Sequence, residues 1–220
     1  MNPMIHQPLT YIYQAAAPGA PTLLLLHGTG GDERDLLPLA AGLAPGFNVL
    51  SVRGNVLENG MPRFFRRLGM GVFDEEDVVF RTHELAQFLR GVSQTEAFDL
   101  TRLVAAGYSN GANIAGGLLL LHPDLLAGAV LWRPMQPLTK PVPAAPALPR
   151  PVPVLFMPGR HDPTTHPTGT ERYAGLLAER GFALTRHDVP AGHNLIQADV
   201  EVAAAWLKEH FSVLTPAPFR

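Results

Sequence analysis

Short apolar runs recur along the chain, each closed by glycine, proline or polar residues. The runs occupy residues 22–26, 47–52, 103–108, 127–132 and 154–157. A run of this length with few polar interruptions is typical of a strand buried on both faces of a sheet. A last strand with rougher alternation is expected over residues 183–189.

Segments with a helical repeat of apolar residues separate these strands. One begins at Asp32, and a longer one begins at the acidic run 74–77, where acidic side chains in the first turn oppose the helix dipole. Further helices are expected after residue 110, over 168–180 with Gly181 following its end, and up to residue 211. Strands alternating with helices predict an α/β fold, with a mostly parallel central sheet covered by helices on both faces.

Two stretches do not fit this alternation. Residues 53–73 show no regular repeat and are expected to be irregular. Proline dominates residues 134–153, a composition that also suits an interdomain linker. The chain that follows is too short for a second domain, so we expect a long surface excursion near the site. The whole chain, residues 1–220, is then one domain of α/β type.

Composition and charge exclude several classes of function. The formal net charge of −2 provides no basic face for nucleic acid, and the lack of cysteine excludes disulfides, cysteine metal sites and a cysteine nucleophile. The N-terminal residues lack the features of a signal peptide, and no apolar run is long enough to span a membrane. A cytoplasmic protein is therefore expected. No pattern of ligands implies a metal or a cofactor, and a homodimer remains open.

The sequence Gly107-Tyr-Ser-Asn-Gly111 lies between an expected strand and an expected helix. This order is what a nucleophile elbow requires, since it exposes the Ser109 hydroxyl beyond the sheet edge while the glycines permit a sharp turn. The motif alone is only moderately specific, because in a chain of this length it arises by chance with a probability of roughly 0.07. Its specificity depends on the partners that follow.

A serine hydroxyl needs a base to accept its proton, and the base needs a carboxylate to orient it. Asp162 follows the strand at 154–157, and His193 follows the last strand. Both therefore fall at the carboxyl ends of parallel strands, in the order Ser, acid, His of α/β-hydrolases. Asp188 is the main rival for the acid, but it belongs to the same strand and loop as His193.

The glycine-rich loop at residues 27–31 follows an early strand, where a second oxyanion-hole donor is expected. We assign the two donors to the backbone amides of Thr29 and Asn110. A similar loop can cradle phosphate, but Glu33 stands where GxGxxG requires its third glycine. Nucleotide binding is therefore disfavoured.

Five segments together resemble a known family: LLLLHGTGGDE, VRGNVLENGMPRFF, AAGYSNGANIA, PGRHDP and AGHNL. They are similar to small bacterial carboxylesterases of the α/β-hydrolase family, related to phospholipase/carboxylesterase and acyl-protein thioesterase enzymes. The likeness is greatest to a branch of hydrolases linked to hydroquinone or quinone stress. It implies Ser109 as nucleophile, Asp162 as acid, His193 as base and no large lid. Val52 departs from the family, which often has proline there.

The resemblance leaves the substrate open. An ester of a small, fairly apolar molecule is the expected substrate, with Met61, Phe64, Phe65, Trp132 and Met135 as candidates for an apolar pocket wall. Ordinary core packing explains each of them equally well. Arg63, Arg66 and Arg67 suit either an anionic group of the substrate or, more simply, a solvated basic face.

Other functions of the same residues remain open. The triad also suits a lysophospholipase, a thioesterase, a peptidase or an acyltransferase. A receptor that uses this scaffold without catalysis is disfavoured, because every member of the triad is present.

Overall fold

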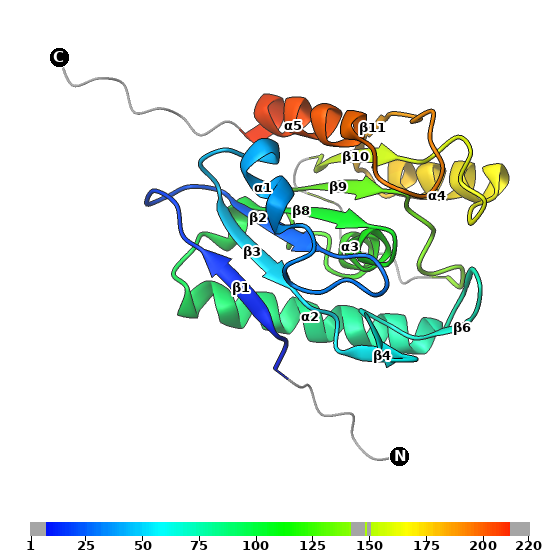
Figure 1. Ribbon diagram of the computed structural model, residues 1–220, viewed down its shortest axis with the longest axis horizontal. Coiled ribbons are helices and arrows are strands. Elements are labelled where there is room, and N and C mark those ends of the chain that lie inside the picture. Colours follow the sequence, from blue (N-terminus) through cyan, green and yellow to red (C-terminus); the bar gives the residue numbers. More distant parts are fainter. Residues whose placement is uncertain (1–7, 142–147, 149–150, 212–220) are drawn as a thin grey trace.

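The computed structural model describes residues 8–141, 148 and 151–211. Its centre is a seven-stranded sheet in the order β1-β3-β2-β8-β9-β10-β11 (Figure 1). Only β1 is antiparallel to its neighbour; the other strands pair in parallel. The bounds are Tyr11–Gln14 for β1, Thr22–Leu26 for β2, Asn48–Val52 for β3, Leu103–Tyr108 for β8, Gly128–Trp132 for β9, Pro153–Met157 for β10 and Ala183–Arg186 for β11.

Helices cover both faces of this sheet. On one face lie α1 (Leu37–Leu43) and α5 (Gln197–Phe211), and on the other lie α2 (Glu75–Thr95), α3 (Asn110–Leu121) and α4 (Pro167–Glu179) (Figure 1). Alternate leucines of β2 serve the two layers: Leu24 packs in the core with α2 and α3, and Leu25 packs in the core with α1 and α5. The predicted fold class, a mostly parallel sheet covered on both faces, is confirmed.

The start of α2 follows the expected chemistry. Asp74 caps the helix, its side chain accepting a hydrogen bond from the Asp77 amide, and Glu75 and Glu76 complete the acidic first turn. In contrast, α1 begins at Leu37 and not at Asp32. The residues between them form turns, and Pro38 stands in the first turn of the helix, where its missing N–H costs nothing. The expectation for this start was wrong by about one turn.

Residues 53–73 were expected to be irregular, and this was wrong: they contain two small hairpins. β4 (Val56–Glu58) pairs with β5 (Met61–Arg63), and β6 (Arg67–Gly69) pairs with β7 (Val72–Phe73). The first turn is Asn59-Gly60, and both residues have positive φ, at 51° and 80°. That geometry matches the tight hairpin turn that Asn-Gly favours. The dipeptide was the sequence signal for this hairpin.

The last strand is shorter than expected, ending at Arg186, with one further bridge between Gly159 and Val189. The proline-rich excursion expected at 134–153 lies partly outside the described residues. Where it begins, Thr139 and Lys140 donate backbone hydrogen bonds to the Glu75 carboxylate at the start of α2. Within the described chain, no helix has the length and apolarity that crossing a membrane would require.

Candidate active site

The turn between β8 and α3 places Ser109 at the carboxyl edge of the sheet. Ser109 has φ 52° and ψ −113°, a backbone conformation that is strained for a residue with a side chain. A Cβ at Gly111 would lie 2.0 Å from the Leu26 carbonyl oxygen, and one at Gly107 would lie 2.5 Å from the Gly111 oxygen. Both glycines are therefore required by the close approach of α3 to the sheet.

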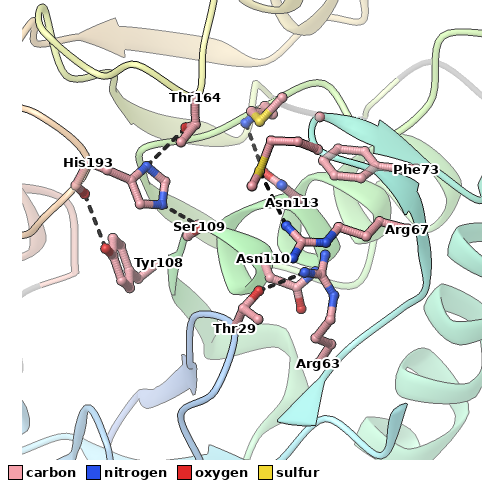
Figure 2. Close-up of a pocket in the computed structure, with 13 residues that line it drawn as sticks. Thr29, Arg63, Arg67, Phe73, Tyr108, Ser109, Asn110, Asn113, Thr164 and His193 are labelled. Atoms are coloured by element: carbon pink, nitrogen blue, oxygen red, sulfur yellow. Dashed lines mark hydrogen bonds between the residues drawn. The ribbon is translucent and has the colours of Figure 1, made fainter. Parts of the chain in front are cut away.

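Ser109, His193 and Asp162 lie together in one hydrogen-bonded chain. His193 Nε2 is 2.9 Å from Ser109 Oγ, and His193 Nδ1 is 2.7 Å from Asp162 Oδ2 (Figure 2). The rival acid Asp188 is engaged elsewhere, because both its oxygens accept hydrogen bonds from Arg186. Such a chain can transfer the serine proton to the imidazole while the carboxylate holds the ring in place.

The buried carboxylate of Asp162 is held by a residue that sequence reasoning missed. Burial raises the pKa of Asp162, but hydrogen bonds from Thr164 and His193 outweigh it, so the pKa lies below its ordinary value. Thr164 donates to Asp162 Oδ1 from its amide at 2.8 Å and from its hydroxyl at 2.7 Å. An aspartate side chain that accepts a hydrogen bond from the amide two residues later forms an Asx turn, and a threonine at that later position can add its hydroxyl. The sequence Asp162-Pro-Thr164 was therefore a signal for this contact. The carboxylate is thus ionised at neutral pH.

Thr29 and Asn110 line the same cavity as Ser109. Asn110 is the first residue of α3, so its amide has no acceptor within the helix. The end of β5 and the residue after it contact both residues: Arg63 Nη1 donates to Thr29 Oγ1 at 2.9 Å, and the Phe64 amide donates to Asn110 Oδ1 at 2.7 Å. The side chains of both residues assigned to the oxyanion hole are therefore held by neighbouring residues of the hairpin segment.

The His27 side chain holds the loop that carries Thr29 through two hydrogen bonds. Its Nε2 accepts a hydrogen bond from the Gly54 amide at 3.0 Å, so Nδ1 carries the proton and donates to the Gly28 carbonyl at 2.6 Å. Burial lowers the pKa of His27, which favours this neutral form. The imidazole thus joins the loop after β2 to the loop that leads into the hairpins.

Arg133 braces the loop that carries His193. It is fully buried at the end of β9, and its guanidinium donates to both oxygens of Asp199 at 2.8 and 2.7 Å. It also donates to the carbonyl oxygens of Gly192 and Asn194, at 2.8 and 3.0 Å, on either side of His193. Sequence reasoning missed this residue, because its partners lie far along the chain.

The cavity around Ser109 has a volume of about 310 Å³, at the lower end of the range for small-molecule sites. Of the five expected wall residues, only Met135 lines it. Phe64, Phe65 and Trp132 are buried in the two cores instead, so the expectation was wrong for them. Met61 is exposed beside Gly30 and lies outside the lining.

The cavity wall is completed by residues that the sequence had not singled out, and by two arginines. The full lining is Thr29, Arg63, Arg67, Met70, Gly71, Phe73, Tyr108, Ser109, Asn110, Asn113, Met135, Thr164 and His193. Among the described residues, no group of three or more histidine or acidic side chains is arranged to hold a metal ion.

No family model matches the chain. Over 188 residues it is 45% identical to "Putative hydrolase MhqD" of Bacillus subtilis, covering 85% of this chain and 92% of that protein. The chain belongs to this family of α/β-hydrolases. The hydrolase is also similar to a solved carboxylesterase of Bacillus cereus, with 43% identity, a TM-score of 0.85 and 96% of each chain covered.

A second solved structure, of YahD with malic acid, matches the hydrolase with a TM-score of 0.85 and 28% identity. The match covers 92% of this chain and 99% of YahD. A carboxylesterase of Mesorhizobium loti gives a TM-score of 0.82 at 29% identity, over 91% and 94% of the two chains. The hydrolase is accordingly an enzyme of the carboxylesterase type.

Proposed function

We propose that the hydrolase cleaves carboxylic esters of small molecules through an acyl-enzyme formed on Ser109. The observation that carries this proposal is the hydrogen-bonded chain from Ser109 through His193 to Asp162, at 2.9 and 2.7 Å. A serine hydroxyl becomes an effective nucleophile at neutral pH only when a base is placed to take its proton. The size of the cavity, about 310 Å³, supports a small acyl group.

In the first half of the reaction, His193 Nε2 takes the proton from Ser109 Oγ as that oxygen attacks the ester carbonyl carbon. The amides of Thr29 and Asn110 donate hydrogen bonds to the resulting oxyanion. The bond to the leaving oxygen then breaks, and the protonated His193 delivers its proton to that oxygen. The products of this half are an alcohol and the acyl-enzyme.

In the second half, water takes the place of the alcohol. His193 accepts a proton from the water as the water oxygen attacks the acyl carbon. The bond between the acyl carbon and Ser109 Oγ then breaks, and His193 returns the proton to Oγ. The ionised Asp162 stabilises the imidazolium in both halves and keeps Nδ1 protonated. A carboxylic acid leaves, and the enzyme is restored.

The test is hydrolysis of p-nitrophenyl esters from acetate to palmitate by the wild type and by Ser109→Ala. We expect the highest kcat/KM on short acyl chains, and a loss of about 10⁴–10⁶ in kcat in the variant. A preference for long chains would point instead to lysophospholipase or thioesterase activity. Turnover that persists in Ser109→Ala would contradict the proposed nucleophile.

A further inference from the structure

Two guanidinium groups face the cavity beside Ser109. Arg63 ends β5 and Arg67 begins β6, so the hairpins bring both into one wall. Their side chains are only 3% and 23% exposed, whereas the neighbouring Arg66 is 59% exposed and pairs with Asp74. The expectation of a solvated basic face therefore holds for Arg66 but is wrong for Arg63.

The charge of this wall is not fully balanced. Glu58 accepts hydrogen bonds from Arg67 Nε at 2.8 Å and from Arg63 Nη1 at 3.1 Å. The hydrogen bond from Arg67 is the main cause that lowers the pKa of Glu58, which is therefore ionised at neutral pH. One carboxylate faces two guanidiniums, and no acidic residue is among the described residues that line the cavity. A net positive charge remains at the wall.

Both arginines keep donors available for a ligand. Arg63 also donates to Thr29 and to the Phe65 carbonyl, and Arg67 Nη1 contacts only the weak acceptor Sδ of Met70. The hydrogen bonds that the two arginines form with described residues use Nε and Nη1 of each, which leaves Nη2 of each for a ligand. Burial, and then the charge of Arg67, lower the pKa of Arg63, so the pair is held at an electrostatic cost that a bound anion would reduce.

The position of the arginines relative to the reacting groups indicates which part of the substrate they meet. The leaving oxygen must lie near His193, which protonates it. In Figure 2, Arg63 and Arg67 lie on the side of Ser109 away from His193. An acyl group that extends away from the leaving oxygen would therefore point toward the two arginines. Phe73, Met70 and Met135 line the same cavity and suit a short hydrocarbon spacer.

We propose that Arg63 and Arg67 form a subsite for a carboxylate at the far end of the acyl group. The favoured substrates are then half-esters of small dicarboxylic acids, in which a few methylene groups separate the free carboxylate from the ester. Guanidinium groups suit this task because their planar donors match a carboxylate in charge and geometry. The inference rests on the proposed ester hydrolysis and specifies its substrate class.

The test compares two esters of the same shape, one charged and one neutral. Methyl hydrogen glutarate carries the free carboxylate, and methyl 4-carbamoylbutanoate carries a primary amide in its place. Acid release at constant pH gives kcat/KM for each, and the methyl half-esters of succinate and adipate vary the spacer. We expect the wild type to favour a charged ester by about tenfold or more, and this preference to shrink with added salt.

Arg67→Gln should reduce the charged-to-neutral ratio to near one. Arg66→Gln, a change of the same kind at an exposed neighbour, should keep the wild-type ratio. Equal kcat/KM for the charged and neutral esters in the wild type would overturn the subsite and leave ester hydrolysis intact. If neither these nor p-nitrophenyl esters show Ser109-dependent turnover, both proposals fail. Because the wild-type ratio is informative by itself, the test does not depend on how the variants fold.

Discussion

Two neighbouring strands are each followed by a residue with an unusual backbone conformation. Ser109 follows β8 with φ 52°, and Arg133 follows β9 with φ 53°. Each is fixed by a backbone hydrogen bond to the next strand, from Ser109 to the Trp132 carbonyl and from Arg133 to the Met157 carbonyl, both at 2.9 Å. Positive φ in a residue with a side chain costs about 1–3 kcal/mol and persists where the surroundings impose it. Here the sheet imposes it at the site.

Asp162→Asn should abolish most activity and change the dependence of stability on pH. The neutral amide favours the wrong imidazole tautomer, so kcat should fall by about 10⁴. The folded-state pKa of Asp162 is below its ordinary value of 3.8, so ionised Asp162 stabilises the fold above that value. As pH falls from above 3.8 through the folded-state pKa, this contribution is lost.

Denaturation of wild type and Asp162→Asn at several pH values measures that contribution. The advantage of the wild type in free energy of unfolding should be present at pH 7 and should narrow on acidification. A difference that stays constant from pH 7 down to the acid limit would contradict the lowered pKa.

Arg133→Met should weaken both stability and catalysis. It leaves the Asp199 carboxylate buried without its partner, a loss that typically costs 3–5 kcal/mol. It also releases the carbonyls beside His193, so kcat should fall more than KM rises. Arg186→Met is the matched control, because its ion pairs are at the surface and should change stability by at most about 1 kcal/mol. Urea denaturation and steady-state kinetics of both variants provide the comparison.

A double variant separates the two roles of Arg133. Arg133→Met with Asp199→Leu removes the pair together, so it should recover part of the lost stability while kcat stays low. Recovery of kcat along with stability would show that Arg133 acts only by stabilising the fold.

The elbow helix α3 shows how one element depends on a glycine. Gly111 lies where a side chain would collide with backbone atoms of β2, and backbone cannot yield as a flexible side chain can. Local structure at the site is therefore set by close contact between α3 and the sheet as much as by hydrogen bonds.

Gly111→Ala should destabilise the hydrolase by several kcal/mol and abolish turnover, because α3 must shift and carry Ser109 with it. Gly175→Ala is the matched control: it lies in α4 with nothing within 4 Å of the added Cβ. We expect it to be neutral or to stabilise by about 0.5–1 kcal/mol. Thermal denaturation of both variants measures their stability, and an equal loss of stability in the two would contradict the steric role of Gly111.

Elements differ in how well the sequence predicts them. The five inner strands of the sheet are buried on both faces, and α2 begins at an acidic run, so these elements were predictable from local pattern. The hairpins were missed because their strands are only two or three residues long, too short for a period to be seen, although Asn59-Gly60 marked one turn. The start of α1 was missed because Pro38, not Asp32, sets it.

Across the whole molecule, the sequence predicts residues whose position follows from the order of strands and loops. It does not predict residues whose role depends on contacts with distant parts of the chain. Ser109, Asp162 and His193 could be assigned because each follows a strand and parallel strands end at the same edge. Arg133 could not, since its importance comes from Gly192 and Asp199, far along the chain. Nor could the sequence show that Phe65 faces the core while Arg63 faces the cavity.

Stability of the whole molecule should depend on the buried sheet and little on the hairpin surface. Leu24→Ala leaves a void at the centre of one core and should cost about 2–5 kcal/mol. Leu57→Ala in β4 changes a side chain that is 69% exposed and should stay within about 0.5 kcal/mol. Equal destabilisation in urea would contradict this division.

Each hairpin pairs only its own two strands, and neither adds a strand to the central sheet. They nevertheless supply both arginines of the cavity, whereas the sheet and its loops supply Ser109, Asp162 and His193. The proposed triad and the proposed carboxylate subsite thus come from separate stretches of the chain. Exchanging residues 55–73 among relatives would replace the proposed carboxylate subsite, together with the contacts of Arg63 and Phe64 to Thr29 and Asn110, and would leave Ser109, Asp162 and His193 in place.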